Sequence, residues 1–249
     1  MKRIILILSL LLSAGVLKAQ FYTGMSGLIH VPSADVYTEG DLRVGTYFLN
    51  KHFTPSDAFV DGGGRYNTMD FYLSVTPFRW LELGYAFTLM KNRHPGYSKS
   101  SYNSKDRYIS LKLTPFREGK YLPSISVGAN DIFSTFSLRG DGYEDRKSEY
   151  FNNYYIAVTK HIDIRRWQLG ATLSYRRFKR HGNDRWNGLV GGLTVSPSFA
   201  RDGRLIAEWD GCRVNVGIDW LLFRHIALQA AMIDCRYFSG GLAYRVNLF

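Results

Sequence analysis

Six titratable residues in the polar stretches of the chain are of the types that hydrolytic enzymes use. They are His94, His161, His181, His225, Asp106 and Asp184. A serine beside a histidine base, or a pair of carboxylic acids, would support hydrolysis of a lipid or a peptide. No serine lies in a nucleophile-elbow motif, and no spacing of His, Cys or acidic residues matches a metal site. The sequence therefore predicts no catalytic residue, cofactor or metal, and an enzyme at the cell surface remains an alternative.

A second set of charged residues lies in stretches where polar and apolar residues alternate. Glu208 and Asp210 share one side of a strand, and Leu205, Ala207 and Trp209 share the other. A charge on the lipid face of a membrane barrel costs about 2–4 kcal/mol near the midplane, so the charged side is expected to face the lumen. In one interpretation, such a lumen is a polar conduit or contacts a ligand. In the other, its charges form ion pairs that brace a narrow lumen. The same rule turns six more charged residues inward: Asp70, Glu82, Lys112, Arg176, Asp219 and Arg245.

The elements that position these residues are strands. Residues 68–76 and 80–90 alternate with period two, and Pro77, which cannot donate a ladder hydrogen bond, is predicted to lie in the turn between them. Similar stretches continue to the end of the chain and predict about twelve strands. Long polar loops, at 54–67, 91–107, 134–150 and 179–186, alternate with short links. Outer-membrane barrels combine short periplasmic turns with longer outer loops.

We therefore predict a transmembrane antiparallel up-and-down β-barrel with about 12 strands over residues 42–249. Aromatic residues near the strand ends fit the two girdles of such a barrel. Both ends of the mature chain are then expected on the periplasmic side. An exported carbohydrate-binding β-sandwich is the alternative fold.

The first residues have the pattern of an export signal. Lys2 and Arg3 precede an apolar run, and a small residue, Ala19, offers a cleavage site. We predict a signal peptide over residues 1–19 and a location in the outer membrane of a Gram-negative type envelope. The formal net charge is +11, and removing Lys2, Arg3 and Lys18 leaves +8. An exported chain makes nucleic acid an improbable partner, whereas anionic lipid or acidic polysaccharide would suit the charge. The alternative is that the basic residues are spread over solvated loops and bind no anion.

Residues 20–41 precede the first strand and lack a strand pattern, although they carry several apolar side chains. Three glycines, Gly84, Gly128 and Gly170, take matching inward positions in three outward-running strands. Glycine inside a strand marks a bend or a close approach by another part of the protein. We therefore predict that part of the lead-in segment enters the periplasmic mouth as a small plug. The alternative is that the glycines relieve curvature and the segment lies below the barrel.

The two cysteines fall at compact outer-side turns of neighbouring hairpins. Disulfides persist in exported proteins, so a bond between Cys212 and Cys235 is predicted. Hairpin tips two strands apart can also lie beyond the roughly 7 Å between Cα atoms that a disulfide spans.

The chain ends on an alternating strand with a terminal aromatic residue, Phe249. This ending resembles the recognition signal read by the outer-membrane assembly machinery, although Phe249 falls one residue out of register with the apolar face. Outer-membrane lipid and that machinery are the expected general partners.

Three stretches carry a resemblance to a known family, and the shortest of them is PSISVGANDI at 123–132. The segment GMSGLIHVPSADVYTEGDLRVG at 24–45 resembles the opening signature of YjbH-like outer-membrane barrels. The stretch AEWDGCRVNVGID at 207–219 is similar to that family's acidic-aromatic-Asp-Gly motif followed by Asn-x-Gly, with Trp209 where Tyr is common. The resemblance implies a short member that serves exopolysaccharide secretion or envelope assembly as a pore or accessory factor. Its specific partner would be a polysaccharide or a secretion component.

Overall fold

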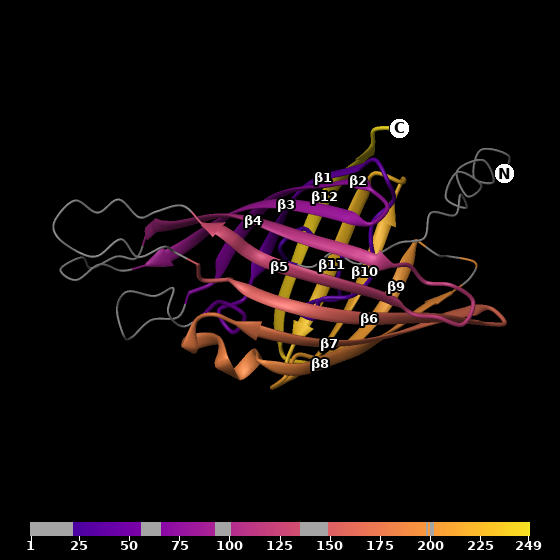
Figure 1. Ribbon diagram of the computed structural model, residues 1–249. Coiled ribbons are helices and arrows are strands. Elements are labelled where there is room, and N and C mark those ends of the chain that lie inside the picture. The colour runs from indigo at the N-terminus through magenta and orange to yellow at the C-terminus, as the bar shows by residue number, and fades with distance from the viewer. Residues whose placement is uncertain (1–21, 56–65, 93–100, 135–148, 198, 200–201) are drawn as a thin grey trace, which may run out of the picture.

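The computed structural model describes residues 22–55, 66–92, 101–134, 149–197, 199 and 202–249. Its twelve strands form one closed barrel in which neighbours in sequence are neighbours in space (Figure 1). Within the described residues, no helix is long and apolar enough to cross a membrane. The strands are β1 (Asp41–Leu49), β2 (Thr68–Phe78), β3 (Leu81–Asn92), β4 (Ser101–Phe116), β5 (Ser124–Ser134), β6 (Asn153–Ile164), β7 (Trp167–Phe178), β8 (Gly188–Pro197), β9 (Gly203–Trp209), β10 (Val214–Leu222), β11 (Ile226–Ile233) and β12 (Tyr237–Asn247).

The barrel closes between its first and last strands. β1 pairs antiparallel with β12, from Asp41 opposite Asn247 to Phe48 opposite Gly240. Because the strand number is even, the beginning of β1 and the end of β12 meet at the same end of the barrel. The prediction of a closed antiparallel barrel of about twelve strands is confirmed.

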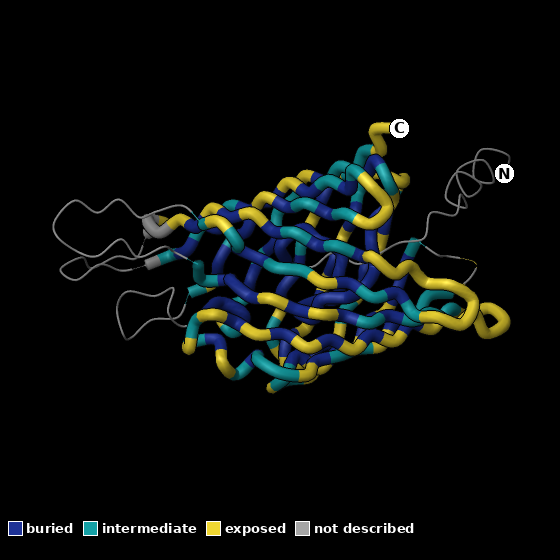
Figure 2. Tube along the Cα trace, viewed as in Figure 1, coloured by how far each residue is buried: buried dark blue, intermediate teal, exposed yellow. Residues whose placement is uncertain are grey.

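Buried and exposed residues alternate along the strands (Figure 2), and many of the exposed ones are large apolar residues. On β8, for example, Leu189 and Leu193 are exposed, whereas Val190 and Thr194 are buried. Outward-facing tryptophans lie near the strand ends, as at Trp80, Trp167, Trp209 and Trp220. An apolar outer band flanked by aromatic residues is the surface that a lipid bilayer requires of a barrel.

Two hairpin turns at the C-terminal end of the chain have both central residues in the left-handed region. Phe223 and Arg224 join β10 to β11, and Asp234 and Cys235 join β11 to β12. These conformations match the type I′ turn, whose twist fits the twist of the flanking strands. The prediction for Pro77 was wrong in detail. This residue lies inside β2 at a register shift between Val75 and Phe78, where no ladder hydrogen bond is required of it.

Most of the predicted long loops lie outside the described residues, as does the predicted signal peptide. Two strands extend into the loop predicted at 91–107, since β3 ends at Asn92 and β4 begins at Ser101. The loop predicted at 179–186 contains a short 3-10 helix, η2 (His181–Trp186).

Residues 22–37 are all buried, although they belong to none of the strands. We call them the internal segment, because their side chains pack against the inward faces of strands around the barrel. The segment contains one isolated antiparallel bridge, between Gly27 and Pro32, closed by a hydrogen bond from the Leu28 amide to the Val31 carbonyl. It reaches the wall again at β1, which begins at Asp41.

Gly40 connects the internal segment to β1 and lies against the end of the chain. Its φ is +83°, and a Cβ at this position would come within 2.7 Å of the Phe249 ring. Its amide donates to the Thr76 carbonyl, and its own carbonyl accepts from the Leu248 amide. Only glycine meets both the backbone and the space requirement here.

The lipid-facing assignment makes a prediction for β8. Leu193, which is 60% exposed at the middle of the strand, should tolerate arginine poorly, and Leu193→Arg should lower the free energy of unfolding by about 2–4 kcal/mol. Leu189→Arg, near the end of the same strand, should cost about 0–1 kcal/mol. Denaturant unfolding in lipid bilayers measures both. Equal costs at the two positions would contradict the assignment.

Candidate functional site

The turn at the tip of the internal segment is held by one carboxylate from β9. Glu208 accepts hydrogen bonds from three consecutive backbone amides, those of Ile29 (2.9 Å), His30 (2.8 Å) and Val31 (3.1 Å). The Asn215 side chain on β10 donates a fourth hydrogen bond to the same carboxylate at 2.9 Å. Successive amides that converge on one anion form a strong binding concavity. The tip is therefore fixed by a wall residue and not by a β-ladder.

A second carboxylate holds together the two arms of the segment, which are the residues before and after its tip. Glu82 on β3 accepts from the backbone and hydroxyl of Ser26 and from the Tyr37 amide at 2.6 Å. Lys112 on β4 forms an ion pair with Glu82 at 3.4 Å and donates to the carbonyls of Ser26 and Asp35. One acid and one base thus bind backbone donors and acceptors of both arms.

Further wall residues bond to other carbonyls and amides of the segment. Arg176 donates to the carbonyls of His30 and Asp210 and to that of Trp186. Three other residues bond to single backbone groups of the segment: Arg204 to the Gly27 carbonyl, Ser174 to the Pro32 carbonyl and Thr159 to the Ala34 amide. An irregular backbone inside a membrane barrel needs such partners, because an unpaired buried polar group is costly.

Glycines in the wall make room for the segment at three places. A Cβ at Gly84 would come within 2.8 Å of the Met25 sulfur. Gly192 and Gly217 are closely approached by the side chains of Leu28 and Ile29. The other two predicted positions differ: Gly128 faces the Tyr155 ring, and Gly170 faces Thr194 and His161, all of which are wall residues.

Aromatic rings pack together beyond the tip. His30 stacks on Phe53 with ring centroids 4.4 Å apart, and its edge meets Trp186 at 4.7 Å. Tyr22 stacks on the other side of His30 at 5.5 Å and packs against Phe151. Phe53 lies shortly after the end of β1, and Trp186 is the last residue of η2. This aromatic layer therefore comes from the loop end of the barrel.

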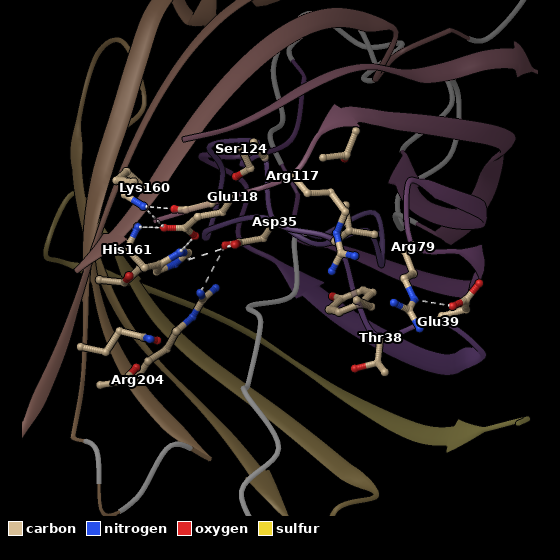
Figure 3. Close-up of a pocket in the computed structure, with 18 of the residues that line it drawn as sticks. Asp35, Thr38, Glu39, Arg79, Arg117, Glu118, Ser124, Lys160, His161 and Arg204 are labelled. Carbon is tan, nitrogen blue, oxygen red and sulfur yellow. Dashed lines mark hydrogen bonds and ion pairs between the residues drawn. The ribbon is translucent and has the colours of Figure 1, made fainter. Parts of the chain in front are cut away.

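At the opposite end a cavity of about 1480 Å³ remains between the internal segment and the short turns. We call it the vestibule. Residues 34–39 line one side, and the β2–β3, β4–β5 and β6–β7 turns together with the ends of β8, β9 and β12 line the rest. Figure 3 shows a chain of contacts across it, from Lys160 through Glu118 and His161 to Asp35 and Arg204.

Glu118 lies in the β4–β5 turn. It is the residue of this series of contacts that lies nearest the aqueous end. Partial burial would raise the pKa of its carboxyl, but hydrogen bonds from the side chain and backbone of His161 and from Lys160 outweigh that effect and lower the pKa below its usual range. The carboxylate is therefore charged at neutral pH and holds the turn on the β6–β7 hairpin.

The eight charged residues that were predicted from the sequence to face the lumen fall into two groups. Glu82, Lys112, Arg176 and Glu208 bond directly to the internal segment. The other four bond mainly within the wall. Asp70 accepts from Thr88, Asp219 from Arg204 and Gln229, Asp210 from the amides of its own turn, and Arg245 donates two hydrogen bonds to Asp41.

Sequence reasoning missed several residues that hold the segment. Thr159 and Ser174 are small and neutral, so nothing in their type distinguishes them from other inward-facing residues. Arg204 lies just before the strand predicted to begin at 205, and extending that alternation by one residue would have placed it inward.

The histidines and acids considered for catalysis do not assemble a serine triad in the part of the chain that the structure describes. His161, His181 and His225 contact Glu118, Asp184 and the Arg245 carbonyl. Asp106 accepts from the hydroxyl of Ser134. His94 lies outside the described residues. The described residues also contain no group of three or more His, Cys or acidic side chains that could hold a metal.

The predicted disulfide is not formed in this structure. The Cys212 thiol donates to Asp210 at 3.3 Å, and the Cys235 thiol lies 3.7 Å from the Val214 carbonyl. Each cysteine lies in a tight turn of its own, and these turns direct the two sulfurs to different oxygen atoms.

A closed barrel with an apolar outer band and a buried polar lumen is an envelope β-barrel of the outer-membrane type. A family model described as exopolysaccharide biosynthesis protein YbjH matches residues 19–184. The chain belongs to this family.

Solved structures with similar barrels include outer membrane phospholipase A from Escherichia coli, at 12% identity and a TM-score of 0.37, covering 85% of this chain and 91% of that one. The Salmonella typhi outer membrane phospholipase dimer with bound calcium has 11% identity and a TM-score of 0.33, covering 85% and 92%. Similarity at this level extends no function to this chain. No curated protein matched the sequence.

The two longer stretches that resemble YjbH-like proteins, 24–45 and 207–219, meet inside the lumen. The first contains the tip of the internal segment, and the second supplies the residues that receive it, Glu208 and Asn215. Gly217, the last glycine of the second stretch, faces the side chain of Ile29 from the first. The spacing of the second motif follows from a hairpin, since Glu208 pairs with Asn215 across β9 and β10.

Removing the carboxylate of Glu208 should loosen the tip. In Glu208→Ala, amide hydrogen exchange at residues 29–31 should accelerate by about 10- to 100-fold, because a hydrogen bond to a charged group contributes roughly 1.5–3 kcal/mol. Glu39→Ala, which removes an exposed acid paired with Arg79, is the control and should leave these amides unchanged. Exchange at 29–31 that stays at the parent rate in Glu208→Ala would show that the carboxylate does not hold the tip.

Proposed function

We propose that the protein serves exopolysaccharide secretion or envelope assembly as a gated pore, and that the internal segment is its plug. The observation that carries this proposal is the filling of the lumen by residues 22–37, which side chains of the wall hold through hydrogen bonds and ion pairs. Family membership supplies the link to exopolysaccharide.

The wall does not need the segment in order to close. All twelve strands pair in a continuous ring, and β1 pairs directly with β12 along eight residue positions. The segment contributes no strand to this ring. Displacing it therefore breaks side-chain contacts without breaking a β-ladder, which is the property that a movable plug requires.

The size of the barrel favours conduction once the segment leaves. Barrels of about eight strands are filled by their own side chains, whereas those of about sixteen hold an aqueous channel. A twelve-stranded barrel lies between these sizes, and here much of the lumen is occupied by backbone and side chains of residues 22–37. Without them, the space left is lined by the charged residues that now bind the segment.

The remaining parts of the proposal concern export and chemistry. A signal peptide at 1–19 directs the chain to the envelope, and the assembly machinery inserts it through the terminal strand ending at Phe249. Its action is transport or assistance to transport, not hydrolysis, which fits the contacts of His161, His181 and His225 with groups other than serine.

Planar-bilayer recordings test the gate. The parent protein should conduct little, and deletion of residues 22–37 should give a steady conductance. Glu82→Ala combined with Glu208→Ala should give intermittent openings, because both anchoring carboxylates are gone while the segment stays attached.

The matched control is Glu39→Ala with Asp184→Ala, which removes two exposed acids that do not anchor the tip or the arms. It should conduct like the parent. Heat-modified mobility on gels verifies that each variant forms a barrel. A deletion variant that assembles and stays closed would rule out the gated pore and leave a non-conducting accessory role.

A further inference from the structure

The vestibule differs from the rest of the lumen in being accessible from the aqueous end. Residues 34–39 and residues at or near the short turns line it (Figure 3). Its cationic lining residues outnumber its carboxylates. The cations are Arg79, Arg117, Lys120, Lys160, Arg204 and Arg245, and the acids are Asp35, Glu39, Glu118 and Asp163.

Every one of these acids already has a partner in the protein. Glu39 pairs with Arg79 at 2.7 Å, Glu118 with Lys160 at 3.0 Å, and Asp35 lies 3.8 Å from both Arg204 and His161. Asp163 accepts a hydrogen bond from Gln168 at 3.1 Å. The acidic groups of the vestibule are therefore engaged in holding its own wall.

Two of the cations have no acidic partner among the described residues. Arg117 and Lys120 lie in the β4–β5 turn, on either side of Glu118 and Gly119. Among the described residues, Lys120 lies over the ring of Tyr121, and Figure 3 shows Arg117 extending into the cavity. An anionic group that enters the vestibule would meet these two charges without displacing an existing ion pair.

The turn that carries these cations is held in a defined position. Lys160 donates to the Gly119 carbonyl at 2.6 Å, and the His161 amide donates to Glu118 at 2.7 Å. Within the turn, the Gly119 amide bonds to the Leu122 carbonyl at 3.0 Å. The β6 end thus clamps the turn over the mouth, so Arg117 and Lys120 are presented to the cavity by a fixed backbone.

The size and remaining lining of the cavity indicate an extended polar ligand. At about 1480 Å³ the vestibule exceeds the roughly 300–1,000 Å³ of common small-molecule pockets. Hydroxyl and amide side chains that suit sugar hydroxyls also line it, and the ring of Phe249 adds one apolar face. These polar residues are Thr114, Ser124, Thr194, Ser196, Gln168 and Asn247.

We propose that the vestibule binds a segment of an acidic polysaccharide, with Arg117 and Lys120 receiving its carboxylate groups. This inference rests on the proposed function and names the class of polymer that the pore would accept. A lipid headgroup fits less well, because the cavity lies inside the barrel and the lipid-facing surface lies outside it. Uncompensated cations would draw the polymer to the closed face of the plug before any opening.

The test measures binding to the full chain in nanodiscs of zwitterionic lipid by calorimetry. The probes are an oligogalacturonate and a malto-oligosaccharide of the same length. The acidic probe should bind more tightly than the neutral one, and added salt should weaken its binding. Arg117→Gln with Lys120→Gln should weaken it about tenfold, as expected for the loss of two exposed charge contacts.

The matched control is Lys51→Gln with Arg236→Gln, which removes two exposed cations at the opposite end of the barrel and should bind the acidic probe like the parent. Equal binding of both probes, or equal weakening by both double variants, would overturn the proposal. So would failure of the acidic probe to bind while a soluble anionic lipid does. The conductance measured after deletion of residues 22–37 does not depend on Arg117 or Lys120. Failure of the vestibule proposal is therefore distinguishable from failure of the gated-pore proposal.

Discussion

The arrangement inside the barrel depends on one carboxylate that receives three consecutive backbone amides. A chain without regular secondary structure cannot satisfy its own donors inside a membrane protein, and water has little access to the buried tip. Glu208 supplies the missing acceptor for Ile29, His30 and Val31 at a single point. Glu82 and Lys112 bind the segment in a similar way elsewhere in the lumen. The Glu82 carboxylate accepts hydrogen bonds from backbone amides, and the Lys112 ammonium donates to backbone carbonyls.

This arrangement gives the charged lumen a use that neither sequence interpretation included. Inward charges were expected to form a conduit or to brace the wall with ion pairs. Several instead bind the main chain of a separate segment, and only some, such as Arg245 with Asp41, brace the wall. The difference matters for energetics, because a buried charge that accepts several amide hydrogen bonds is compensated without an opposite charge of its own.

Period-two alternation and the sorting of loops by length were sufficient to predict the closed barrel and its strand number. They were sufficient because a lipid-facing strand has no other way to arrange its side chains. The contacts of the internal segment were harder to predict. Gly84 lies against Met25 of the segment, whereas Gly128 and Gly170 lie against side chains of the wall. Strand patterns fix a residue's side and height, whereas the path of an irregular segment is set by hydrogen bonds from residues far along the chain.

The same long-range contacts fix an order of assembly. The Val31 amide and its acceptor on Glu208 are 177 residues apart in sequence, and Gly40 packs on the final residue, Phe249. Neither contact can form until nearly the whole wall has been built. The tip of the segment is therefore anchored late in assembly, although it belongs to the first described residues of the chain. Release of the tip in the proposed gate would reverse this late step.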